Sequence, residues 1–157
     1  MQWLAERGAV VTISASGRQS PAHTPQWTFR VSPGLSVSTD LRQSVTAEEA
    51  TVAECMRVVL PRLRGAGLPM DESPWAPDLE PEDSMEGIGM LVLDWLVEQG
   101  VSVFLKADGE RPIPGWTFFT PEGGPLTEFL RADGTYAENC FTPMLDNLRR
   151  QGLPVPV

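Results

Sequence analysis

The chain has 157 residues, of which 41% are apolar and 21% are charged, a composition typical of a folded globular protein rather than a disordered one. Its net charge of −9 disfavours nucleic acid and anionic membrane surfaces as ligands, and it favours a basic partner. The length allows one domain or two very small ones.

Two stretches of the chain resemble each other. Residues 94–109 align with residues 2–17 without a gap, Trp116-Thr117-Phe118 repeats Trp27-Thr28-Phe29, and the region around Cys140 matches the region around Cys55. Such self-similarity is typical of an internal repeat, and a unit this small needs a shared core. We therefore interpret the chain as an α+β protein, a tandem duplication of a helix–three antiparallel strands–helix unit with the two copies packed as a pseudo-twofold pair. The predicted units are residues 1–69 and 83–157, joined by a connector at 70–82.

In chain order, the first half begins with a predicted helix at residues 2–7 that ends at Gly8. Apolar and polar residues alternate over residues 9–15, which predicts a strand. A second strand is predicted around Trp27 and Phe29, and a third over residues 35–41. The spacing of Thr46 and Glu49 is that of a capping box, so a helix is predicted to start there; Pro61 should kink or end it.

The second half is predicted to follow the same order. Asp83 and Glu86 suggest a capping box for a helix that ends at Gly100. Strands are predicted at residues 101–107, around Trp116 and Phe118, and at residues 126–130. Thr142-Pro143 has the pattern of an N-cap followed by proline at the first helical position, which predicts a last helix over residues 144–150.

Helices on one face of a sheet leave its other face uncovered. The predicted outward positions are polar in the first half (Thr12, Arg30 and Asp40) and aromatic in the second (Phe104, Phe119 and Phe129). Three contiguous exposed phenylalanines would form an apolar patch of a kind that soluble monomers seldom keep. Four kinds of cover are open: the connector with Trp75, the other copy, a second chain in a homodimer, or a partner protein.

The connector is rich in proline and in acidic residues, so it is predicted to be a stiff, extended segment. Its carboxylates and those just after it could bind a basic partner, or the connector could be only a solvated linker. The candidate partner-binding residues are therefore Asp71, Glu72, Asp78, Glu80, Glu82, Asp83, Phe104, Phe119 and Phe129.

Little in the sequence indicates catalysis. His23 is the single histidine, which excludes paired-histidine mechanisms. Cys55 and Cys140 are interpreted as buried helix residues, with a disulfide between them as the alternative. Asp108 and Asp133 each precede a glycine and are interpreted as turn residues. No catalytic residue, cofactor or metal ligand is predicted, although a carboxylate-based enzyme or a weak calcium site in the connector stays open.

These features favour a small acidic protein-binding protein, of the immunity or antitoxin kind, that inhibits a basic partner. One alternative is a small-molecule-binding or enzymatic module with a cleft between the repeats, near Trp27 and Trp116. Another is a structural homodimer without catalytic activity. No apolar run is long enough to span a bilayer, and Glu6 and Arg7 stand where a signal peptide would have its apolar core. A cytoplasmic location is therefore expected.

Overall fold

The structure, a computed structural model, describes residues 2–17, 24–34, 43–66, 85–113 and 115–155. The helices and strands of this part of the chain are, in order, α1 (Gln2–Glu6), β1 (Val10–Ala15), β2 (Trp27–Ser32), β3 (Val45–Glu49), α2 (Val52–Gly65), α3 (Met85–Glu98), β4 (Val103–Asp108), β5 (Gly115–Thr120), β6 (Leu130–Gly134) and α4 (Ala137–Arg150).

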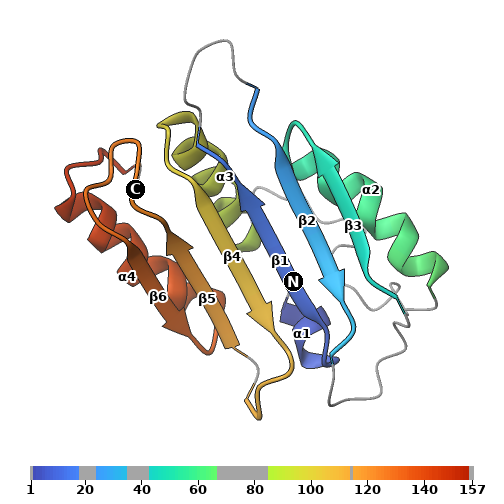
Figure 1. Cartoon of the computed structure of the whole chain (residues 1–157). Helices are drawn as coiled ribbons and strands as arrows, with labels where there is room; N and C mark the ends of the chain where they lie inside the picture. The colour runs from blue at the N-terminus through green and yellow to red at the C-terminus, as the bar shows by residue number, and fades with distance from the viewer. Residues whose placement is uncertain (1, 18–23, 35–42, 67–84, 114, 156–157) are drawn as a thin grey trace.

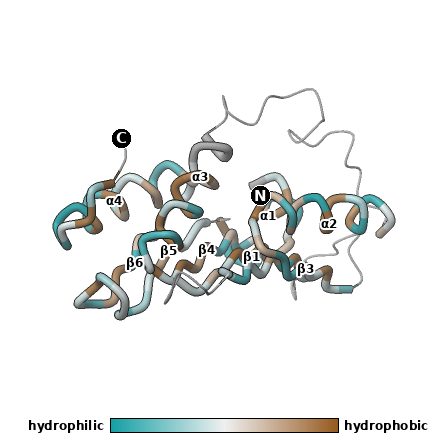
Figure 2. The backbone as a smooth tube through the Cα atoms, turned by 90° about the horizontal axis from the view of Figure 1, so that it is seen from above, coloured by the Kyte–Doolittle hydropathy of each residue, from teal (hydrophilic) through white to brown (hydrophobic). Residues whose placement is uncertain are grey.

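The strands form one sheet in the order β3-β2-β1-β4-β5-β6, and every neighbouring pair is antiparallel. β1 and β4 lie at its centre (Figure 1). Seen from above, the four described helices lie on the same side of the sheet (Figure 2). The described part of the chain therefore has two layers, and none of its helices lies on the other face of the sheet.

The predicted fold class is wrong. The described residues form an α+β fold with one six-stranded antiparallel sheet and four helices, and no tandem helix–three-strand duplication packed as a pair is shown. The two halves instead join edge to edge, because β1 and β4 pair from Val10↔Asp108 to Ala15↔Val103. This pairing satisfies backbone N–H and C=O groups that two separate three-stranded sheets would each expose along an edge.

The core lies between the sheet and the helices. Alternate residues of the central strands face the helices, among them Ile13 on β1 and Leu105 on β4, and both are buried. They share one cluster with buried residues of the helices, such as Leu63 of α2, Leu96 of α3 and Leu148 of α4. The predicted alternation of these two strands is thus confirmed.

A glycine at each end of the β1–β4 pair allows two backbone segments to lie in close contact. A Cβ atom at Gly17 would collide with the carbonyl oxygen of Gly100, and one at Gly109 would collide with the carbonyl oxygen of Ala5. The Gly109 N–H donates to the Ala9 carbonyl oxygen at 3.1 Å. These contacts bring the turn that precedes each central strand against the end of the other strand.

The predicted start of α2 is wrong. Thr46 lies in β3, which pairs with β2 and turns Ala47 toward the core, where it is buried. The helix begins after Thr51, whose Oγ1 accepts from the Glu54 N–H at 3.2 Å, while Glu54 Oε2 accepts from the Thr51 N–H at 3.1 Å. Pro61 does not end the helix, which continues to Gly65. The strand predicted at residues 35–41 lies outside the described residues.

The second half also differs from its prediction at its third strand and its last helix. Its third strand is β6, and residues 126–129 precede it rather than belonging to it. The last helix starts at Ala137, so that Thr142 and Pro143 lie inside it and not at its beginning. The predictions of α1, α3, β2 and β5 are confirmed, although Asp83 lies outside the described residues.

Candidate functional site

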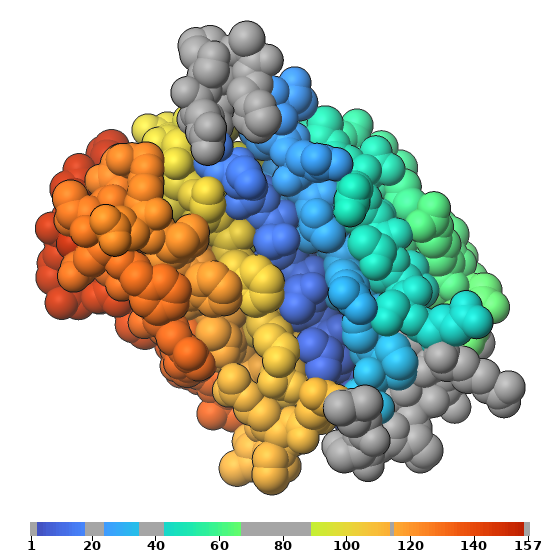
Figure 3. Space-filling view, in the orientation of Figure 1, coloured from blue at the N-terminus to red at the C-terminus, as the bar shows by residue number. Residues whose placement is uncertain are grey.

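The face of the sheet that none of the described helices covers, called the open face below, carries a different set of side chains from the core. It receives the alternate residues of each strand, because neighbouring side chains of a strand point to opposite faces. The open-face residues are Val10, Thr12, Ser14, Thr28, Arg30, Ser32, Thr46, Glu48, Phe104, Lys106, Asp108, Thr117, Phe119, Arg131 and Asp133. Figure 3 shows this face with β1 and β4 in the middle.

Three phenylalanines gather on the β4–β5–β6 half of the open face and form what we call the phenylalanine cluster. Phe104 and Phe119 are direct cross-strand neighbours, with ring centroids 4.4 Å apart and stacked planes. Phe129, in the segment before β6, contacts Phe119 at a centroid distance of 5.6 Å. The cluster predicted from the sequence is thus confirmed as a contiguous group.

The cluster is partly accessible to solvent. Phe129 is 55% exposed, whereas Phe104 and Phe119 are half-buried by each other and by their neighbours. The halves of the molecule do not cover the cluster by packing face to face, because they meet edge to edge through β1 and β4. Trp75, predicted as another cover, lies outside the described residues.

An ionic network borders the cluster; its residues lie on the same three strands and between β4 and β5. Asp108 Oδ2 lies 2.8 Å from Lys106 Nζ and 3.4 Å from Arg111 Nε. Burial alone would raise the pKa of the Asp108 carboxyl. Hydrogen bonds from Lys106 Nζ and the Glu110 N–H, with the charges of Lys106 and Arg111, outweigh burial and lower this pKa below its ordinary value.

Asp133 extends the network to β6. Arg131 Nε lies 2.8 Å from Asp133 Oδ2, and Thr117 Oγ1 donates to Asp133 Oδ1 at 2.6 Å. The Arg131 hydrogen bond is the largest cause that lowers the pKa of Asp133; partial burial opposes it, and Thr117 and the Arg111 charge act with it. The interpretation of Asp133 as a turn residue is wrong, because it lies inside β6 and pairs with Arg131. Asp108 is the last residue of β4 and has the predicted turn role, since its Oδ1 accepts from the Glu110 N–H at 3.1 Å, and it also pairs with Lys106 and Arg111.

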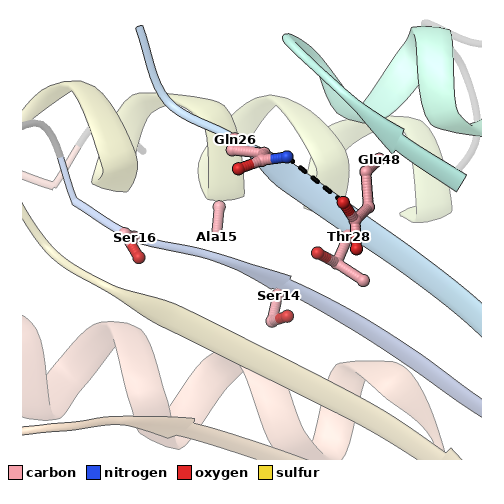
Figure 4. A pocket seen from close by; sticks show the side chains of 6 residues that line it. All are labelled: Ser14, Ala15, Ser16, Gln26, Thr28 and Glu48. Atoms are coloured by element: carbon pink, nitrogen blue, oxygen red, sulfur yellow. Dashed lines mark hydrogen bonds between the residues drawn. The ribbon is translucent and has the colours of Figure 1, made fainter. Parts of the chain in front are cut away.

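A hollow of about 260 Å³ lies on the β1–β2–β3 half of the open face (Figure 4). We call it the polar hollow, and it is lined by Ser14, Ala15, Ser16, Gln26, Thr28 and Glu48. Gln26 Nε2 donates to Glu48 Oε2 at 3.3 Å across it. This hollow was not predicted from the sequence. The signal for it was small polar residues on strands expected to be neighbours, namely Ser14, Ser16 and Thr28.

The two cysteines lie away from the open face. Both are free and fully buried on helices, as predicted, and no disulfide joins them. Cys55 Sγ donates to the Trp27 carbonyl oxygen at 3.3 Å, and Cys140 Sγ donates to the Ala132 carbonyl oxygen at 3.1 Å. Burial raises the pKa of both thiols, that of Cys140 to about 12. A thiol held this way is a poor nucleophile, since the thiolate is the reactive form.

Other predicted site residues are placed as follows. Asp71, Glu72, Asp78, Glu80, Glu82 and Asp83 lie outside the described residues, as does His23. Trp27 and Trp116 are buried core residues on β2 and β5, and β1 and β4 lie between these strands. In the described part of the chain, the two tryptophans therefore do not line a common cleft.

Comparison with known proteins assigns no family. No family model, curated protein or solved structure matches this chain. Within the described ranges, no group of three or more His, Cys, Asp or Glu side chains could hold a metal ion. None of the helices in those ranges combines the length and the apolar character needed to cross a membrane.

Proposed function

We propose that this protein binds another protein through the open face of its sheet, with the phenylalanine cluster as the anchor. The observation that carries this proposal is the contiguous, partly exposed group of Phe104, Phe119 and Phe129 on a face that no described helix covers. Exposed apolar patches of this kind mark interaction sites. Aromatic side chains are also the residues that dominate the binding energy of protein interfaces.

The proposed partner is basic. The chain's net charge of −9 would attract a positively charged protein and speed their encounter. The charged residues next to the cluster are proposed to form the polar rim of the interface. Lys106, Arg111 and Arg131 are already paired with carboxylates there. Asp71, Glu72, Asp78, Glu80, Glu82 and Asp83 are proposed to contribute negative charge that attracts the partner.

An inhibitor of the immunity or antitoxin kind is the class of protein that best suits a small acidic chain with an aromatic docking face. We also propose a cytoplasmic location for this inhibitor.

Affinity capture from lysate of the source cells tests this function. The bait is the full chain, at low and at moderate salt, next to Phe119→Asp and Phe129→Asp. We expect the bait to retain one stoichiometric basic protein, and we expect this binding to weaken as the salt concentration rises. Both variants should fail to retain that protein. Phe129→Asp guards against misfolding, because Phe129 lies in a loop and is 55% exposed.

Leu91→Asp is the matched control. Leu91 is 63% exposed on α3, so the same charge is added to an apolar position on the helix layer rather than on the open face. It should retain the partner. Equal capture by the original chain, Phe119→Asp and Phe129→Asp would overturn the proposal, and capture only of further copies of the chain would replace it with a homodimer.

A further inference from the structure

The polar hollow and the phenylalanine cluster belong to one row of side chains that crosses the whole sheet. Strand register places Glu48 beside Thr28, Thr28 beside Ser14, and Ser14 beside Phe104. The row then continues through Phe119 to Arg131. A partner seated on the cluster would therefore extend directly over the hollow.

The chemistry of the hollow suits a cation that donates hydrogen bonds. Glu48 is the one charged residue among the described residues that line it, and the Ser14, Ser16 and Thr28 hydroxyls can all accept. The hydrogen bond from Gln26 occupies Glu48 Oε2, so the other carboxylate oxygen takes no part in it. A phosphate or carboxylate ligand would be repelled by Glu48, whereas a guanidinium group offers five N–H donors and no acceptor.

We propose that the polar hollow receives an arginine side chain of the basic partner. This inference rests on the proposed function and names the chemistry that selects the partner. Neighbouring strands lie about 4.8 Å apart, so Thr28 lies roughly 12 Å across the sheet from the midpoint between Phe104 and Phe119. The partner therefore presents an apolar anchor on the phenylalanine cluster and an arginine roughly 12 Å away along the same row.

Two-dimensional ¹H–¹⁵N NMR of the full chain tests the hollow without the partner. The probe is N-acetyl-L-arginine methylamide, and N-acetyl-L-citrulline methylamide has nearly the same shape without the charge. We expect the arginine probe to shift the backbone resonances of Ser14, Ser16 and Thr28 and the side-chain amide of Gln26. We expect at least about tenfold weaker binding of the citrulline probe.

Glu48→Gln should abolish the preference for arginine. Glu98→Gln is the matched control, because Glu98 is exposed at the end of α3 on the helix layer, and it should leave the preference unchanged. The inference is overturned by equal shifts with both probes, by shifts that map away from the hollow, or by no shifts up to the solubility of the arginine probe.

Failure of this inference can be told apart from failure of the proposed function. If the arginine probe does not bind while Phe119→Asp and Phe129→Asp abolish capture, the hollow has no such role and the cluster is still the interface. If the probe binds while those variants capture the partner normally, the hollow binds guanidinium groups and the cluster is not the interface.

Discussion

The two halves of the sheet are alike on the face toward the helices and different on the open face. Toward the helices, β1 carries Val11 and Ile13 and β4 carries Val103 and Leu105, and all four side chains are buried. On the open face, the β1–β2–β3 half is polar and hollowed, whereas the β4–β5–β6 half carries the phenylalanine cluster and the ionic network. The helix-facing residues thus specify the fold, and the open-face residues are where the halves can differ in function.

The largest effects should come from the helix-facing positions of both halves. Phe29→Ala on β2 and Phe118→Ala on β5 each remove a fully buried ring and should lower the free energy of unfolding by about 3–5 kcal/mol. Phe119→Ala, next to Phe118 but on the open face, should lower it by only about 1 kcal/mol, because its ring is half-exposed. Urea unfolding of the three variants measures this; equal losses at residues 118 and 119 would contradict the assignment of the two faces.

The junction of the halves should be the next most sensitive region. Gly109→Ala places a Cβ atom against backbone oxygens of Ala5 and Ala9, which cannot move away as a flexible side chain could. We expect a loss of about 1–3 kcal/mol in thermal or urea unfolding. Gly65→Ala at the end of α2 meets nothing within 4 Å and should be neutral or slightly stabilising. A harmless Gly109→Ala would show that this contact does not hold the two halves together.

The ionic network should make the free energy of unfolding depend on pH in the acidic range. The pKa of Asp108 is lower in the folded state than its ordinary value of 3.8, so its contribution is fully present above that value and is lost as the pH falls through the folded pKa. Asp108→Asn should cost about 1 kcal/mol at neutral pH and almost nothing in strong acid. The free energy of unfolding of the original chain and of Asp108→Asn, measured from neutral pH to strong acid, gives this difference. A difference that stays the same at every pH would contradict the assigned ion pairs.

The smallest effects on stability should come from the N-caps of α2 and α4, which differ from each other. Thr51→Ala removes the capping bond to the Glu54 N–H and should cost about 1 kcal/mol. The equivalent position of α4 is Tyr136, where Asn139 Oδ1 accepts from the Tyr136 backbone N–H at 3.3 Å. Tyr136→Ser should supply a better cap and raise the melting temperature slightly. A decrease would indicate that the Tyr136 ring contributes more than its 57% exposure suggests.

Short-range patterns predicted the parts of the fold that depend on them. The alternation in β1 and β4 predicted which residues face the core, and the same reasoning predicted the phenylalanine cluster. The start of α2 could not be chosen in this way, because Thr46 with Glu49 and Thr51 with Glu54 have the same capping spacing. Pairing of β3 with β2 decides between them, and that pairing is a long-range interaction.

The arrangement of the two halves and the polar hollow on the open face could not be predicted from the sequence, because both depend on long-range strand pairing. Self-similarity between residues 2–17 and 94–109 does not determine which strand edges meet, and the pairing of β1 with β4 overturned the predicted packing of two copies. The polar hollow needs the register of three strands to bring Ser14, Thr28 and Glu48 together. The ion pairs Lys106–Asp108 and Arg131–Asp133 are local, because each joins residues two positions apart on one strand. The Arg111–Asp108 pair and the Thr117–Asp133 hydrogen bond depend on a turn or on a neighbouring strand.

Photo-crosslinking in the source cells tests most directly whether the aromatic half of the open face is a protein interface. The photoreactive residue p-benzoylphenylalanine replaces Phe129 on the cluster in one protein and Leu91 on the helix layer in another. The account predicts a cross-link from position 129 to one basic protein and no such product from position 91. Absence of a cross-link from position 129, or the same product from both positions, would contradict it.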